Sequence, residues 1–311
     1  MPADVAPAET NAIHSTEASV IHDLGYQRYT GGRYGRAAIA RTLAGYSLRS
    51  AFGLGRSARA KIVPVGVFVL MSLPAIINAF LVARGGSRAF PYDTYSYPVR
   101  VVAMTIFIAA QAPELVSRDL RHRVLPLYFA RPLRPAGYAL AKLAALITAC
   151  LVMLDVPLLL LYVSTIVGVH GGAAVWAQTT ALLPGLALGL LWSVVLATVG
   201  LAIASSGGRR ALAAGGVAAF FFLTWILSKV LGAVAMPPGH AVVASTAAKV
   251  AGLVSPFTLL DGVRQWLGGT SPGAVPDPGG TWGAGYALIL LALVAAGLAA
   301  LVTRYRKAGA A

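Results

Sequence analysis

Six stretches of mostly apolar residues set the limits on how this chain can fold. They lie near residues 62–83, 98–117, 139–168, 178–204, 211–235 and 284–303. A helix of about 20 apolar residues crosses the hydrocarbon core of a bilayer. Because a spanning segment must satisfy its backbone polar groups internally, these stretches favour helices. The sequence therefore predicts an all-α membrane protein with six transmembrane helices.

The composition agrees with a membrane location. Of the 311 residues, 58% are hydrophobic and 11% are charged, whereas soluble domains carry roughly 25% charged residues. A net charge of +15 could indicate nucleic-acid binding, but such basic patches lie on polar, soluble faces. Here the basic residues lie between apolar stretches, so we expect no nucleic-acid partner. We expect a multi-pass protein of the plasma membrane, surrounded by the lipid bilayer.

Basic residues predict which ends of the spans face the cytoplasm. They gather before the first span, in the loop 113–142, at Arg209 and Arg210, and after the sixth span. Short loops rich in Lys and Arg stay on the cytoplasmic side. Both termini are therefore expected to be cytoplasmic.

The second stretch, 98–117, is the weakest of the six. Its continuous apolar core, Val101 to Ala112, is too short to span a bilayer by itself and could belong to an interfacial segment. However, basic segments precede the first span and follow the second, and the chain must cross twice between them. We therefore expect 98–117 to span.

The flanking segments complete the predicted organisation. Residues 1–35 and 306–311 are expected to form cytoplasmic tails, the first of them disordered, around a transmembrane domain over 62–305. Residues 36–61 predict an amphipathic, interfacial elbow helix, with Ile39, Leu43 and Tyr46 on one face. Alternatively, 36–61 is a basic juxtamembrane stretch that only fixes topology, because its glycines weaken a helix.

An extracellular segment is predicted over 236–283. Within it, Leu259, Val263 and Trp266 recur at helical spacing, which predicts a short amphipathic helix with Trp266 at the interface. This helix could cover the exit of a translocation path as a lid. The alternative, which we favour from the sequence, is a surface helix that rests on the lipid headgroups.

Several kinds of site lack the residues that they need. A phosphate-binding P-loop requires Gly-Lys followed by Ser or Thr, and no lysine of this chain follows a glycine. The histidines lack metal-ligand spacing, no nucleophile is paired with a base, and Cys150 is expected to serve packing. We expect no catalytic, metal or cofactor-binding residues, and therefore no enzyme activity in this chain.

Asp155 is the most unusual residue of the predicted spans. A carboxylate in the middle of a span is unfavourable by ~3 kcal/mol on insertion scales, so Asp155 should face protein or water. It could line a substrate or ion path, or it could pair with a hydroxyl or a base such as Lys229. We favour the structural role. Close helix contact is also expected at Gly185 and Gly189, which form a GxxxG pattern.

The loop 113–142 has the sequence PELVSRDLRHRVLPLYFARPLRPAGYALAK. A glutamate ends the second span, a basic helix follows, and an Arg-Pro-Leu element precedes a Tyr-x-x-x-Lys pattern. This arrangement resembles the ABC-2 type permeases, the membrane subunits of ATP-binding cassette transporters, over about residues 36–305. The resemblance implies coupling to an ATPase through Glu114, Arg118, Asp119, Arg121, His122, Leu125, Arg131 and Pro132.

The helical pattern of the loop is compatible with such coupling. Leu120, Val124 and Leu127 would form one apolar face, while Arg118 and Leu125 would point the opposite way, and Pro126 would end or kink the helix. One face could then pack on the bundle while the other docks a partner. The alternative is that the arginines only bind anionic headgroups, at about 1 kcal/mol each.

The resemblance also implies partners and an energy source. ATP would be bound by two copies of a separate ABC-type ATPase. The permease would assemble as a homodimer or as a heterodimer with a related permease. The implied activity is export across the plasma membrane. A different class remains open, a non-transporting membrane scaffold or assembly subunit whose basic loop holds a cytoplasmic partner.

The chain itself is expected to hold no cofactor, because the resemblance assigns ATP to the partner subunit.

Overall fold

The structure is a computed structural model. It describes residues 31, 35–86, 90–93, 95, 97–121, 128, 133–207, 209–235, 245–269 and 278–310, except for the side chains of 117, 118, 120, 121 and 308–310. The chain divides into two units, Met1–Tyr34 and Gly35–Ala311. Every described helix belongs to the second unit, and the predicted tail over 1–35 lies almost entirely outside the described residues.

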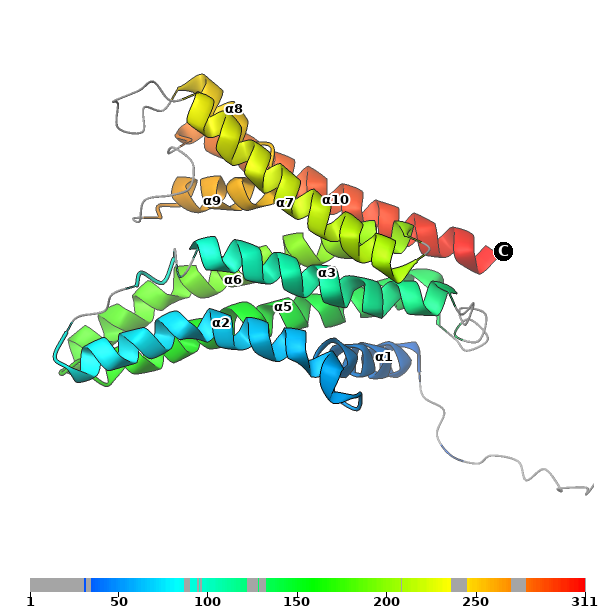
Figure 1. The fold of residues 1–311 in the computed structure, drawn as a ribbon, viewed down its shortest axis with the longest axis horizontal. Helices are drawn as coiled ribbons and strands as arrows, with labels where there is room; N and C mark the ends of the chain where they lie inside the picture. Colours follow the sequence, from blue (N-terminus) through cyan, green and yellow to red (C-terminus); the bar gives the residue numbers. More distant parts are fainter. Residues whose placement is uncertain are drawn as a thin grey trace, which may run out of the picture. The chain divides into compact units, whose positions relative to one another are not determined.

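The second unit is a bundle of helices (Figure 1). Its helices are α1 (Arg36–Ala51), α2 (Ala58–Ala83), α3 (Tyr97–Arg121), α5 (Pro135–Ile166), α6 (Gly172–Ser206), α7 (Arg210–Val234), α8 (Thr246–Gly252), α9 (Pro256–Trp266) and α10 (Gly280–Ala310). The described part of the chain contains no β-strand. The all-helical prediction is confirmed for these residues.

Within the described residues, six helices are long and apolar enough to cross a membrane, as predicted. The spans are Ala58–Ala83, Tyr97–Val116, Pro135–Ile166, Gly172–Ser206, Arg210–Val234 and Gly280–Lys307. Their bounds differ from the predicted ones by a few residues. The first span begins earlier than predicted because Arg59 and Lys61 continue the helix beyond its apolar stretch.

The weakest predicted span, in α3, lies at the centre of the bundle. Its mean hydropathy is 1.5, the lowest of the six, while 78% of its most apolar window is buried inside the protein, the highest share of the six. A helix surrounded by other helices does not need an apolar surface toward lipid. This burial explains why hydropathy alone gives a weak signal for α3.

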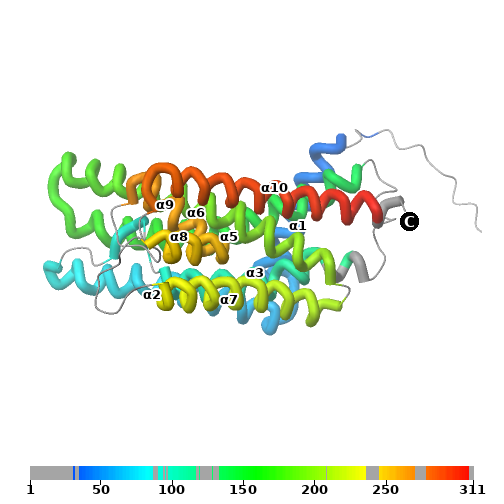
Figure 2. The backbone as a smooth tube through the Cα atoms, turned by 90° about the horizontal axis from the view of Figure 1, so that it is seen from above, coloured from blue at the N-terminus to red at the C-terminus, as the bar shows by residue number. Residues whose placement is uncertain are grey.

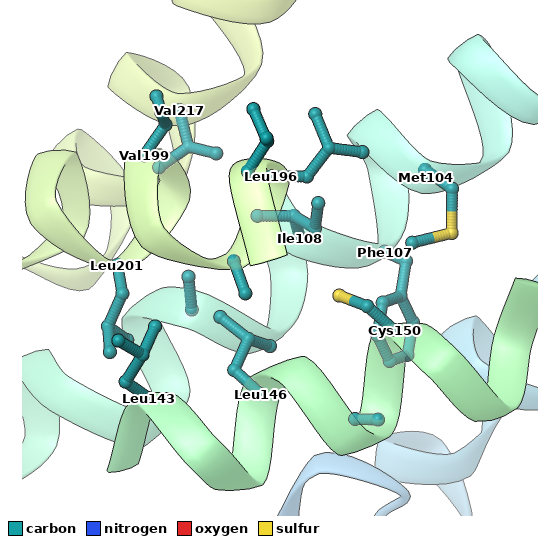
Figure 3. Packing of buried hydrophobic residues seen from close by; sticks show 14 of the residues in the cluster. Met104, Phe107, Ile108, Leu143, Leu146, Cys150, Leu196, Val199, Leu201 and Val217 are labelled. Carbon is teal, nitrogen blue, oxygen red and sulfur yellow. The ribbon is translucent and has the colours of Figure 1, made fainter. Parts of the chain in front are cut away.

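The core forms where α3, α5 and α6 meet. Phe107 and Ile108 of α3, Leu146 and Cys150 of α5, and Leu196 of α6 lie together there (Figure 3). The contact is close, because a Cβ atom added at Gly200 of α6 would lie 2.3 Å from Cγ2 of Ile108. Cys150 is buried in this core, which agrees with its predicted packing role.

The long helices alternate in direction along the bundle. The end of α3, the start of α7 and the end of α10 lie at the end of the bundle where α1 lies, which we call the α1 end (Figure 1). Helices α8 and α9 lie at the opposite end, the α9 end. Helices α7 and α10 overlap in Figure 1 but lie apart in Figure 2, with α8 and α9 between them.

A helix, α1, occupies most of the predicted elbow segment. It packs against α5 and α3 through a buried stripe formed by Leu43, Ser47 and Ala51. Of the three residues expected to share one face, Leu43 is buried, whereas Tyr46 is 68% exposed. The buried stripe is therefore rotated from the predicted one, because small residues allow α1 to approach the bundle closely.

Helix α1 ends in a turn that two glycines make possible. Gly53 and Gly55 have φ angles of 68° and 77°, values that residues with a Cβ atom rarely adopt. The N–H groups of Gly53 and Leu54 donate to the carbonyl oxygens of Ser50 and Arg49, at 3.0 and 2.9 Å. These two bonds form a Schellman motif, which satisfies carbonyl groups at the end of the helix.

The favoured prediction for the helix around Leu259, Val263 and Trp266, that it rests on the lipid headgroups, is wrong. Helix α9 does not rest on a surface, since its residues from Pro256 to Arg264 are buried and it contacts α10, α7 and α6. A Cβ atom added at Gly262 would lie 2.4 Å from Cδ1 of Tyr286 on α10. Its two charges do not prevent burial, because Arg264 Nε donates to Asp261 Oδ1 at 3.0 Å.

The alternating directions allow a test of membrane orientation. In a background in which Cys150 is replaced by alanine, we expect a cysteine at His170, between α5 and α6, to react with an impermeant maleimide in intact cells. A cysteine at Ser206, at the α1 end, should react only after the membrane is opened, because the basic end is expected inside. Labelling of Ser206→Cys in intact cells would contradict the cytoplasmic position of this end.

Candidate functional site

Glu114 lies at the α1 end of α3 and joins three parts of the chain. Its Oε1 atom is 2.6 Å from Nη1 of Arg56, which belongs to the turn between α1 and α2. Its Oε2 atom is 3.0 Å from Nη1 of Arg210, the first residue of α7. The Glu114 side chain is only 3% exposed, so the two arginines satisfy a carboxylate that is otherwise shielded from water.

Asp119 forms a second link one turn further along α3. Its Oδ2 atom is 2.9 Å from Nζ of Lys142 on α5 and also accepts a hydrogen bond from the Tyr138 hydroxyl. The Tyr138 ring lies 5.1 Å from the ring of Tyr305 on α10, centroid to centroid. Tyr138 and Lys142 are the residues of the Tyr-x-x-x-Lys pattern, and one helical turn brings both to the same carboxylate.

Together, these contacts tie the end of α3 to the rest of the bundle. Glu114 connects it to the α1–α2 turn and to α7, while Asp119 connects it to α5 and, through Tyr138, to α10. Charge-assisted hydrogen bonds of this kind are short and directional. A displacement of the segment that follows α3 would therefore be transmitted to most of the spans.

Only part of the predicted coupling set lies within the described residues. Glu114 and Asp119 are described, and their carboxylates face neighbouring helices instead of the surface. The backbone at Arg118 and Arg121 continues α3 without a break after the span, but their side chains are outside the described residues. His122, Leu125, Arg131 and Pro132 also lie outside them, so their docking role stays a prediction.

The sequence reasoning missed Arg56 and Arg210 as partners of Glu114. A signal was present, because both arginines flank predicted spans at the expected inner end. A carboxylate at the end of an apolar stretch needs a nearby base to become buried. Searching the same end for such bases would have found Arg56 and Arg210.

Asp155 lies on α5 against Gly189 of α6. A Cβ atom added at Gly189 would be 1.9 Å from Oδ1 of Asp155, and one added at Gly185 would be 3.0 Å from Cδ2 of Leu158. The GxxxG pattern therefore mediates contact between α5 and α6 within one chain. Among the described residues, Oδ1 of Asp155 has no hydrogen-bond partner. The suggested pairing of Asp155 with a hydroxyl or with Lys229 stays a prediction.

A second polar network lies at the α9 end. Nη1 of Arg264 is 2.8 Å from Oδ2 of Asp93, in the segment that precedes α3, while Nη2 of Arg100 donates to the Tyr95 carbonyl oxygen at 2.5 Å. The Tyr95 hydroxyl donates to the Met71 carbonyl oxygen at 2.7 Å, and burial raises the pKa of Tyr95 to about 12. This network fastens α9 and α2 to the start of α3.

Comparison with known proteins gives no family assignment: no protein-family model matches this chain, and no curated protein matches it. The fold of the described residues therefore defines only a broad class, a multi-pass membrane protein with six apolar helices.

Proposed function

We propose that this chain is the membrane permease subunit of an ABC transporter of the ABC-2 type, driven by ATPase subunits that are separate proteins. The observation that carries the proposal is the end of α3, which lies within the basic segment 113–142. Ion pairs join it to the α1–α2 turn, α7 and α5, and Tyr138 extends the contact to Tyr305 of α10. A segment that must transmit a partner's movement needs such connections. A loop that only binds headgroups does not need them.

The proposed mechanism follows from these contacts. ATPase subunits that close on ATP would push the 118–134 segment, which continues from α3. Because α3 is helical through Arg121, the push would act on Glu114 and Asp119 without being absorbed by a hinge between them. The ion pairs would then carry the α1–α2 turn, the start of α7 and the start of α5 along with α3, and the bundle would change between two access states.

The proposal includes an assembly. Two copies of this chain, or one copy with a related permease, would bind two ATPase subunits and export a cargo across the plasma membrane. The sequence supplies no P-loop, so the energy for transport would come from the partner.

The docking role predicts a specific defect. The double substitution Arg121→Glu and Leu125→Asp should release an ABC-type ATPase that co-purifies with the tagged wild-type chain. Both changes lie in the basic loop, where charge reversal opposes a complementary partner surface. The measurement is the amount of ATPase retained per chain on an affinity column.

A matched charge reversal serves as the control. Arg41→Glu alters an exposed arginine of α1 outside the loop and should retain the ATPase. Normal retention by the Arg121/Leu125 variant would refute docking through this loop. A partner that is retained by the wild-type chain but hydrolyses no ATP would instead favour the scaffold.

A further inference from the structure

A cavity of about 590 Å³ lies at the α1 end, beside the turn that joins α1 to α2. It is lined by the last turns of α1 and by the turn itself, with Tyr46, Arg49, Ser50, Leu54, Gly55 and Arg56 as its wall. Arg49 is exposed, and no hydrogen bond or ion pair joins its side chain to the described residues. Its guanidinium group therefore has donors available for a ligand.

The backbone around this cavity does not oppose an anion. The end of a helix normally presents unsatisfied carbonyl oxygens, which carry partial negative charge. At the end of α1, the carbonyl oxygens of Arg49 and Ser50 accept hydrogen bonds from Leu54 and Gly53. The Schellman motif thus reduces the repulsion that an anion would meet beside Arg49 and Ser50.

The charges near the cavity are positive on balance. No Asp or Glu occurs in the sequence between Asp23 and Asp93. Arg56 is paired with Glu114, but Glu114 is shared with Arg210, so this group of three side chains keeps a net positive charge. The Arg56 side chain is 28% exposed, so part of it can face an anion in the cavity while Nη1 holds Glu114.

The apolar surroundings distinguish a lipid from a free anion. Tyr46 and Leu54, both in the cavity wall, are exposed. Helix α2 begins directly after the turn and carries a stripe of exposed apolar residues, which includes Ile62, Val65 and Val69. Ile62 lies about 6 Å of helix rise after Ala58, the first residue of α2. An anion in the cavity therefore lies close to a surface that acyl chains can cover.

We propose that this cavity binds the phosphate headgroup of an anionic phospholipid of the inner leaflet, through Arg49, Ser50 and the free edge of Arg56. The acyl chains lie along the exposed stripe of α2. Because Arg56 also holds Glu114, the headgroup and the end of α3 share one guanidinium group. The lipid site is independent of the proposed ATPase and would exist in the isolated chain.

The test uses the purified full-length chain in a neutral detergent, with native mass spectrometry to count bound lipid. Phosphatidylglycerol and phosphatidylcholine with the same acyl chains are titrated separately. We expect Arg49→Gln to weaken phosphatidylglycerol binding about tenfold, which is the loss of one charge-assisted hydrogen bond. Phosphatidylcholine binding should be the same in wild type and variant.

The matched control is Arg41→Gln, which removes the same charge from the same helix but outside the cavity. It should change phosphatidylglycerol binding less than about twofold. Arg49→Lys, which keeps the charge, should retain part of the affinity and shows that loss in Arg49→Gln is not caused by misfolding. Equal losses in Arg41→Gln and Arg49→Gln would overturn the site in favour of general attraction to a basic helix.

A competition experiment distinguishes a lipid ligand from a free anion. Inorganic phosphate in large excess should not displace phosphatidylglycerol, because it lacks the contacts of the acyl chains. Displacement that depends on Arg49 would overturn the lipid assignment and indicate a site for soluble phosphate.

Discussion

In a complex with the proposed ATPase, replacing Glu114 with glutamine should leave the bundle folded but prevent ATP hydrolysis from moving the start of α7 and the end of α6 that directly precedes it. Glutamine keeps the shape of the side chain but removes the charge that binds Arg56 at 2.6 Å and Arg210 at 3.0 Å. The loss of a charged hydrogen bond in a shielded position amounts to about 2 kcal/mol, which corresponds to a change on the order of thirtyfold in a rate or an equilibrium constant.

This result can be measured without knowledge of the cargo. In the assembled complex, the labelling rate of Ser206→Cys at the end of α6 should change on addition of ATP. In the Glu114→Gln complex, ATP should still be hydrolysed, but the labelling rate should stay constant. A full ATP-dependent change in the Glu114→Gln complex would show that this carboxylate does not transmit the movement.

The two arginines provide an internal comparison. Arg56 is 28% exposed and Arg210 is 62% exposed, and exposed ion pairs contribute only about 0–1 kcal/mol. Arg56→Gln should therefore destabilise the chain more than Arg210→Gln in reversible unfolding from mixed micelles. A double-mutant cycle of Glu114→Gln with Arg56→Gln should be non-additive, because the residues are in direct contact.

Adding a single methyl group at Gly189 should destabilise the contact between α5 and α6. The Cβ atom of Gly189→Ala would lie 1.9 Å from Oδ1 and 2.9 Å from Cγ of Asp155, so the buried Asp155 carboxylate must rotate away or the two helices must move apart. Overpacking of this kind costs about 2 kcal/mol. The combination with Asp155→Ala should recover most of the loss, since it removes the atoms that clash. Unfolding of purified chains in mixed micelles measures both effects.

Gly215→Ala on α7 is the control, because a Cβ atom at that position meets no atom within 4 Å. It should be neutral or slightly stabilising, since alanine favours a helix over glycine by about 1 kcal/mol. If Gly189→Ala behaved like Gly215→Ala, the close contact of Asp155 with α6 would be wrong. Asp155→Asn should fold and assemble normally; an assembled Asp155→Asn complex that hydrolyses ATP but moves no cargo would place Asp155 on the translocation path.

The six spans could be predicted because length and hydropathy report directly on contact with lipid. The exception, α3, needed the distribution of arginines, since Arg100, Gln111 and Glu114 lower its hydropathy while lying buried among other helices. Hydropathy reports which residues a helix contains, and it does not report whether lipid or other helices surround them. For a helix at the centre of a bundle, these two properties differ.

Helix α9 was placed wrongly for a related physical reason. The prediction rested on one apolar face formed by Leu259, Val263 and Trp266. Asp261 and Arg264 are nevertheless buried, because they pair with each other and Arg264 also pairs with Asp93. A buried pair of opposite charges and an exposed pair have the same sequence pattern. The distant partner, Asp93, could not be identified from the spacing within α9.

The candidate site could be predicted only in part. Glu114 and Asp119 were recognised as residues of a basic loop, but not as links to other helices. The convergence of Tyr138 and Lys142 on Asp119 depends on how α5 is rotated against α3. Hydropathy does not fix that rotation, because both faces of α5 near Tyr138 carry small or apolar residues.

The central position of α3 also determines how the chain can enter a membrane during synthesis. When α3 leaves the translocation machinery, only α1 and α2 precede it, and α5, α6 and α7 have not yet been made. Its later-buried polar residues, Thr105 and Gln111 among them, then face lipid or the translocation channel. We therefore expect α3 to be retained at the channel until α5 and α6 arrive. Chains truncated after residue 134 should insert α3 poorly, whereas chains that extend through Ser206 should insert it fully.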